Sequence, residues 1–224
     1  MKNKFMIATQ ANKIPFFSVI VCTYNRELLL KRALDSLGKQ SESDWECIIV
    51  DDGSSDNTFE LCKYYVEQYP NFKYIFHQNR GQSLSRNTGI LASSGIYITF
   101  LDSDDEYEED HLLIRKDCLI QNPDVDFVHG GVKIIGNEFV PDINNPNKLI
   151  HLKDCVIGGT FFIKNSVAIE LNGFENIKYG DDANFYEKVK DNDYQIGVID
   201  YPTYIYYRDT PDSLCNQIIE LQKQ

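Results

Sequence analysis

Two aspartates, Asp102 and Asp104, come directly after residues 97–101, an apolar segment typical of a buried strand. Because side chains alternate along an extended chain, these two carboxylates point to the same side. They repel each other unless a cation or a proton lies close by. Carboxylate oxygens suit Mg²⁺ or Mn²⁺, which also bind phosphate oxygens. The pair therefore predicts a divalent-metal site that holds the diphosphate of an activated substrate.

The alternative interpretation of these acidic residues is helix capping, because carboxylates near a helix N-terminus are stabilised by the helix dipole. Capping is the better interpretation for the acidic members of residues 106–110. It explains Asp102 and Asp104 less well, since they precede the predicted helix and follow a buried strand. Ser103, which lies between them, is included among the candidate ligand-binding residues.

Two more polar clusters follow predicted strands, at residues 23–26 and 51–54. In an open parallel sheet the carboxyl ends of the strands meet at one edge, where such folds bind ligands. Each cluster also has an ordinary explanation. Asn25 could cap the following helix, and the Asp-Gly sequence after Asp51 is a common turn. The convergence of three clusters on one edge is the stronger argument for a binding site.

Two further groups could complete such a site. Arg86, in the segment 79–87, could pair with a phosphate or with the acidic cluster, or could be a surface cation of a helix. Residues 180–182, Gly-Asp-Asp, begin a predicted helix in the second half of the chain. Taken alone, that pattern favours ordinary capping. The four histidines have no spacing that indicates zinc.

The segments that position these clusters alternate between strand and helix patterns. Strands are expected at 17–23, 47–50, 72–76 and 97–101, and helices at 27–37, 56–68 (with Asp56 as N-cap), 82–93 and 108–121. This alternation predicts a parallel sheet covered by helices on both faces. The second half is less regular, with strands expected at 127–135, 156–163 and 194–199, a helix at 183–189 and a loop at 140–146.

The length, charge and cysteine content of the chain exclude several classes of protein. The 224 residues suffice for one α/β domain, and the net charge of -12 excludes the basic surface that nucleic-acid binding needs. The six cysteines form no C-x-x-C pair and are expected to be reduced thiols. The apolar runs are too short to span a membrane, and the N-terminus resembles neither a signal peptide nor an anchor. A cytoplasmic protein is expected, with peripheral contact at the inner face of the membrane left open.

Six segments together resemble the family 2 glycosyltransferases, a large inverting group with the GT-A fold. The resemblance runs from about residue 17 to residue 207, and its segments are SVIVCTYNR, IIVDDGSSDNT, NRGQSLSRNTGI, YITFLDSDDEY, GGTFFIKNSV and GDDANFYEKV. The resemblance implies one Rossmann-like domain over 16–210, with a mostly parallel central sheet flanked by helices. Residues 16–105 would bind the nucleotide sugar and 106–210 the acceptor. Residues 1–15 would be an N-terminal extension and 211–224 a tail or short helix.

The resemblance also implies a role for each candidate residue. Asp182 matches the general base, and Asp102 and Asp104 match the D-x-D motif, with Asp104 the better candidate for direct contact with Mn²⁺ or Mg²⁺. Asp52 would contact the uracil, and residues 158–161 would lie near the acceptor or the donor sugar. The residues expected to bind the nucleotide sugar are Thr23, Tyr24, Asn25, Asp52, Arg86, Asp102 and Ser103.

The implied activity is transfer of one hexosyl or N-acetylhexosaminyl group from a UDP-sugar to a hydroxyl of a saccharide or lipid-linked saccharide, most often in bacterial surface polysaccharide synthesis. Two departures from the family pattern matter. Arg208 is followed by Asp209 and Thr210, where many relatives have Arg-x-His. Processive relatives carry Gln-x-x-Arg-Trp, whereas the only tryptophan here is Trp45, so we expect non-processive transfer.

Other functions were weighed against this one. No G-x-G-x-x-G or Walker A sequence follows the first strand, which argues against a dinucleotide site. A sugar-nucleotide pyrophosphorylase needs a glycine-rich loop with a basic residue there, and the sequence TYNR does not supply one. A non-catalytic sugar-nucleotide-binding domain, acting as a regulator or scaffold, stays open as the alternative to an enzyme.

Overall fold

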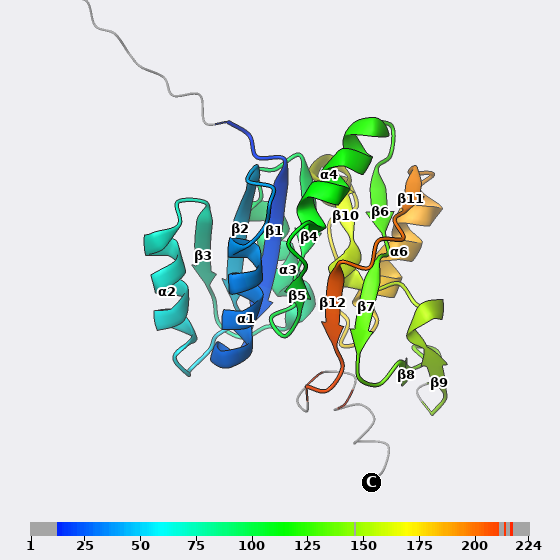
Figure 1. Cartoon of the computed structure of the whole chain (residues 1–224). Coiled ribbons are helices and arrows are strands. Elements are labelled where there is room, and N and C mark those ends of the chain that lie inside the picture. The colour runs from blue at the N-terminus through cyan, green and yellow to red at the C-terminus, as the bar shows by residue number, and fades with distance from the viewer. Residues whose placement is uncertain (1–12, 146, 211–212, 214–215, 217–224) are drawn as a thin grey trace, which may run out of the picture.

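The main sheet has seven strands in the order β11-β6-β10-β4-β1-β2-β3 (Figure 1). The computed structural model describes residues 13–145, 147–210, 213 and 216. In spatial order, the strands are β11 (Ile196–Val198), β6 (Phe127–His129), β10 (Phe162–Lys164), β4 (Tyr97–Phe100), β1 (Phe17–Thr23), β2 (Trp45–Asp51) and β3 (Phe72–Phe76). β10 pairs antiparallel with β4 and β6, and the other pairings of this sheet are parallel. The predicted mostly parallel α/β sheet is confirmed.

Helices cover both faces of the main sheet (Figure 1). One face carries α1 (Glu27–Gly38), α2 (Thr58–Gln68) and α4 (His111–Gln121). The other face carries α3 (Gln82–Ala92), α5 (Asn165–Glu170) and α6 (Asp181–Asp191). A hydrophobic cluster lies between the sheet and each helix layer.

The side chains of β1 alternate between these two clusters. Val19 and Val21 pack against the layer of α1, and Ile20 packs against the layer of α3. All three side chains are at most 1% exposed. A strand covered on both faces needs no polar side, which explains the continuous apolar run in the sequence.

Two smaller sheets lie beside the main one. A three-stranded sheet has the order β5-β12-β7, and a two-stranded antiparallel hairpin joins β8 to β9. Their bounds are β5 (Glu106–Tyr107), β12 (Tyr204–Tyr207), β7 (Val132–Ile135), β8 (Phe139–Pro141) and β9 (Leu149–His151). Two 3₁₀ turns, η1 (Leu152–Asp154) and η2 (Gly158–Thr160), follow the hairpin. The three-stranded sheet packs on the same face as α1 and α4, through Tyr107 and Tyr204.

Two predicted helix starts were wrong by two or three residues. The N-cap of α2 is Asn57, not Asp56, although the Asp56 carboxylate still accepts the N–H of Thr58 at 3.1 Å. α4 begins at His111 and not at residue 108. The residues just before it, 106–107, are extended and pair with β12, which keeps them out of the helix.

The second half departs further from the prediction. The single strand expected at 127–135 is two strands in different sheets, because Gly130 and Gly131 take positive φ angles of 99° and 76° and turn the chain between them. The strand expected at 156–163 is η2 followed by β10. β8 takes the first residues of the loop expected at 140–146, and β12 was not predicted.

The terminal predictions fall mostly outside the described residues. This holds for nearly all of the proposed extension, 1–15, and of the tail, 211–224. In the described part of the chain, no helix has both the length and the apolar character needed to cross a bilayer.

We predict that Leu34→Ala destabilises the protein by about 2–5 kcal/mol, because it removes a fully buried side chain between α1 and β1. Leu28, on the same helix, is 84% exposed, so Leu28→Ala is the matched control and should change stability by no more than about 0.5 kcal/mol. Urea unfolding at equilibrium measures both. Equal effects of the two substitutions would contradict the packing of α1 described above.

Candidate active site

The loop after β1 is joined to the loop after β2 through Asn25. This residue has a φ angle of 50°, its backbone N–H donates to Ser54 Oγ at 2.9 Å, and its Oδ1 accepts the N–H of Ser55 at 2.7 Å. The two predicted loops therefore lie together at the edge of the sheet, and the Asn25 side chain binds the next loop instead of capping α1. Thr23 is buried and, within the described residues, its hydroxyl has no partner, whereas Tyr24 is half exposed.

Asp51, the last residue of β2, and Asp52, which follows it, both accept hydrogen bonds from other parts of the protein. Asp51 accepts the hydroxyl of Tyr74 at 2.7 Å. The two carboxylate oxygens of Asp52 accept the backbone N–H groups of Arg80 and Gly81, each at 2.8 Å. Asp52 thus fixes the segment that leads into α3. The ring nitrogen Nδ1 of His77 also lies 3.3 Å from Asp52 Oδ1. A carboxylate has about four acceptor positions, so one more N–H donor can still bind.

Arg86 joins the end of β4 to the start of α6. Its guanidinium donates to Asp102 Oδ1 at 3.1 Å and to Asp181 Oδ2 at 2.9 Å, and the residue is 4% exposed. The rings of Phe100 and Phe174, which contact each other, lie 5.7 and 5.3 Å from the guanidinium carbon. Burial opposes the charge, but the two carboxylates outweigh it and raise the pKa of Arg86. The predicted pairing of Arg86 with the acidic cluster is therefore present, through Asp102, and Arg86 is not a surface cation.

Asp104 is held by two arginines. Its Oδ2 lies 3.0 Å from Nη1 of Arg26, the residue just before α1. Its main-chain oxygen accepts a hydrogen bond from Arg32, within α1. Ser103, between Asp102 and Asp104, is 4% exposed. The candidate metal carboxylates therefore each face a guanidinium, Asp102 that of Arg86 and Asp104 that of Arg26.

Asp105 is fully buried and belongs to the scaffold under the loop. It accepts the hydroxyl of Tyr204 at 2.6 Å and the backbone N–H of Tyr207 at 2.8 Å. Burial, followed by the charges of Asp104 and Asp102, raises the pKa of Asp105 well above its ordinary value. These bonds tie the loop to β12. Sequence reasoning missed Tyr204, since its only signal was an aromatic run near the end of the domain.

Asp182 lies at the first turn of α6, close to the turn η2. Its Oδ2 accepts the N–H of Gly158 at 3.1 Å, and its Oδ1 accepts the N–H of Ala183 at 2.8 Å. Burial of the carboxyl group and the neighbouring charge of Asp181 raise the pKa of Asp182 to about 6. A carboxyl group with this pKa is a base at neutral pH and a stronger one than an ordinary aspartate.

The glycines of η2 allow this close approach. A Cβ on Gly158 would lie 3.1 Å from the Cβ of Asp182. A Cβ on Gly159 would lie 2.2 Å from the ring of Tyr204. The segment 158–161, expected near the sugars, thus contacts both the candidate base and Tyr204 of β12, which bonds to the loop of the candidate metal carboxylates.

The chemistry of these side chains fits a hard divalent cation. Asp102 and Asp104 offer carboxylate oxygens on one loop, and no third His, Cys, Asp or Glu of the described residues completes a cluster with them. Mg²⁺ and Mn²⁺ bind through one or two carboxylates when phosphate oxygens and water fill the other positions. Asp102 and Asp104 are therefore the residues that could hold such a cation.

Comparisons with known proteins agree with this fold. The chain is 30% identical over 223 residues to the minor teichoic acid biosynthesis protein GgaA of Bacillus subtilis (strain 168), a match that covers 90% of this chain and 49% of GgaA. It spans only part of the first curated relatives it matches, between 14% and 49% of their lengths.

Two solved structures show the same GT-A fold. S. aureus TarS 1–349 in complex with UDP-GlcNAc superposes with a TM-score of 0.73 at 23% identity, covering 88% of this chain and 60% of that one. The mannosyltransferase PcManGT from Pyrobaculum calidifontis, in complex with GDP-Man and Mn²⁺, gives 0.70 at 20% identity, covering 90% and 59%. The model of Glycosyl transferase family 2 matches residues 18–174, and the chain belongs to this family.

Proposed function

We propose that the chain is an inverting, non-processive glycosyltransferase that moves one sugar from a UDP-sugar to a hydroxyl of a saccharide or lipid-linked saccharide, in the synthesis of a bacterial surface polysaccharide. The observation that carries the proposal is the bridge of Arg86 between Asp102 and Asp181. It connects a candidate diphosphate site at the end of β4 with a candidate base, Asp182, at the start of α6.

The donor end of the site comprises the loops after β1, β2 and β4. Thr23, Tyr24 and Asn25 would line the nucleotide pocket, and Asp52 would accept the uracil N–H beside its two backbone bonds. The buried Thr23 hydroxyl, which has no partner among the described residues, supports this role because such a group needs a hydrogen bond. The UDP-GlcNAc complex of TarS and the name of GgaA support a UDP-sugar donor and a bacterial surface product.

At the acceptor end, Asp182 would take the proton from the attacking hydroxyl. The hydroxyl oxygen forms a bond to the anomeric carbon, and the bond from that carbon to the diphosphate oxygen breaks with inversion. The proton passes to Asp182, and UDP leaves with the electron pair. The hydrogen bonds from Gly158 and Ala183 orient the carboxylate for this step.

The leaving group needs positive charge instead of an acid, because UDP departs as an anion. A divalent cation bound by Asp102 and Asp104 would supply that charge. One carboxylate base then suffices, unlike the two carboxyl groups of a glycosidase. Arg86 would hold Asp102 in place from below, with its guanidinium between that carboxylate and Asp181.

We predict that Asp182→Asn lowers kcat at least about 100-fold, the usual contribution of a general base, and leaves UDP binding largely unchanged. Release of UDP in the presence of acceptor measures turnover, and calorimetry measures binding. Glu187→Gln is the matched control, because Glu187 lies on the same helix and pairs with Lys190 at the surface. Weak UDP binding by Asp182→Asn would mean that the residue is structural. Normal turnover by it would refute the role as base.

We predict that kcat/KM rises with pH through about 6 and then levels off. The cause is the raised pKa of Asp182, since the base acts only when it has lost its proton, which occurs above that value. The residual activity of Asp182→Asn should lack this inflection. An inflection near the ordinary aspartate pKa of 3.8, or none, would contradict the assignment.

We also predict that EDTA abolishes transfer and that Mn²⁺ or Mg²⁺ restores it, because Asp102 and Asp104 are otherwise left without a cation to share with the diphosphate. UDP binding, followed by calorimetry, should weaken in the chelator. Full activity in EDTA would refute the metal site. UDP binding without turnover on any acceptor would favour the regulatory domain instead.

A further inference from the structure

Asp104 is contacted by two arginines, one just before α1 and one within it, and the two contacts differ in kind. Arg26 forms an ion pair with the carboxylate itself, 3.0 Å from Oδ2. Arg32 instead donates to the main-chain oxygen of Asp104. α1 thus controls both the backbone and the charge of the residue best suited to bind the metal.

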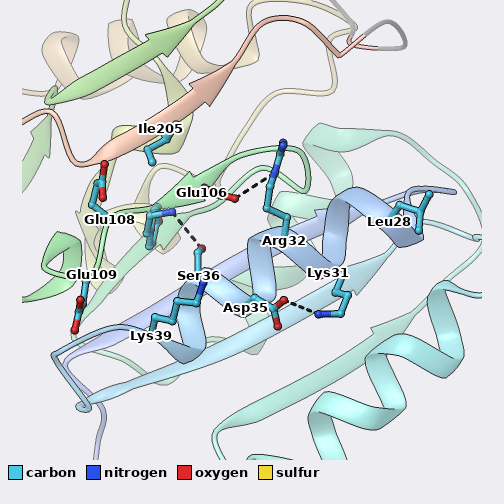
Figure 2. A pocket seen from close by; sticks show the side chains of 11 residues that line it. Leu28, Lys31, Arg32, Asp35, Ser36, Lys39, Glu106, Glu108, Glu109 and Ile205 are labelled. Carbon is cyan, nitrogen blue, oxygen red and sulfur yellow. Dashed lines mark hydrogen bonds and ion pairs between the residues drawn. The ribbon is translucent and has the colours of Figure 1, made fainter.

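Arg32 is fixed by contacts on several sides. Its Nε lies 3.5 Å from Glu106 Oε1, and its guanidinium carbon lies 3.7 Å above the ring of Tyr207. Figure 2 shows Arg32 pointing from α1 toward Glu106, on the wall of a cavity of about 470 Å³ that Leu28 and Lys31 also line. None of these contacts involves the Asp104 carboxylate. The position of Arg32 therefore does not depend on what that carboxylate binds.

Arg26 is in the opposite situation. Its partner, Asp104 Oδ2, is an oxygen that a divalent cation at this site would use. A guanidinium and a cation repel each other at one oxygen. The Arg26 and Asp104 side chains are 19% and 11% exposed, so the pair is accessible enough to separate. The diphosphate that comes with the cation would offer the displaced guanidinium a new anionic partner at the same edge of the sheet.

We propose that Arg32 is a positioning residue that holds the Asp104 loop in the geometry for metal binding, and that Arg26 is an exchangeable counter-ion. Arg26 neutralises Asp104 before the donor binds, gives up the carboxylate to the cation, and turns to the diphosphate. This inference rests on the proposed function, because it takes Asp104 as the metal ligand.

The test uses two substitutions that remove the same charge near the same carboxylate. Arg26→Gln removes the competitor and should tighten Mn²⁺ binding without nucleotide by about two- to five-fold, the value of a partly exposed ion pair. The same variant should bind UDP more weakly in saturating Mn²⁺. Arg32→Gln should weaken Mn²⁺ binding by about ten-fold or more, the usual loss when a partner of a metal ligand is removed.

Calorimetric titration of the full chain with MnCl₂, and then with UDP, provides the readout without any need for activity. Lys31→Gln is the matched control, because Lys31 lines the same cavity and pairs with Asp35 on the solvent side, so its Mn²⁺ affinity should equal that of the wild type. Arg32→Lys should fold normally but bind Mn²⁺ as weakly as Arg32→Gln. A single ammonium cannot reproduce the contacts with the carbonyl, Glu106 and the Tyr207 ring together.

The outcomes separate this inference from the function on which it rests. Opposite shifts for Arg26→Gln and Arg32→Gln support it. If both substitutions shift the Mn²⁺ affinity in the same direction, the two arginines act only through their charge and the inference is overturned. The proposed function would still stand in that case, provided that the wild-type protein binds Mn²⁺ and UDP. If the wild type binds UDP but not Mn²⁺, the metal site and this inference both fail. If a thermal melt shows that Arg32→Gln is unfolded, the Mn²⁺ affinity of Arg32→Lys provides the test in its place.

Discussion

The buried charge of Arg86 is the interaction on which the candidate site depends. A guanidinium taken out of water needs close acceptors, and Asp102 and Asp181 supply carboxylates from two distant parts of the chain. Satisfying Arg86 therefore requires the end of β4 and the start of α6 to meet. Burial and the charge of Asp181 raise the pKa of the neighbouring Asp182, and the charge of Arg86 only partly opposes them.

The acidic run after β4 divides according to its partners. Asp102 faces Arg86, Asp104 faces Arg26, and Asp105 is buried against the hydroxyl of Tyr204. Neighbouring residues of one type thus have separate environments, two at the ligand edge and one in the scaffold. The fully buried Asp105 gives the loop a fixed base, because its oxygens accept a hydroxyl and an amide of β12.

The sequence was a good guide wherever the signal was local. The apolar run of β1 predicted a buried strand of the sheet, since a strand buried on both faces has few alternatives, and the polar residues after β1 and β2 do lie together at one edge. The break at Gly130 and Gly131 did have a local signal, because a Gly-Gly pair marks a turn, but the apolar residues on either side were interpreted as one strand. The pairing of β12 could not be predicted in the same way, since it depends on contacts with the distant strands β5 and β7, for which no local periodicity exists.

The hairpin of β8 and β9 has a consequence for how such a protein can evolve. It packs on a small cluster, formed by Val140, Leu152 and Ile157, that also contacts side chains of β7 and β12, and its strands pair with neither larger sheet. A hydrogen bond from the Tyr179 hydroxyl to Pro141 O at 2.6 Å ties it to the segment before α6. Substitutions of its exposed side chains, such as Phe139 and Leu149, would leave the main core intact. Selection can therefore change the surface of this hairpin while the edge of the main sheet that carries the aspartates stays the same.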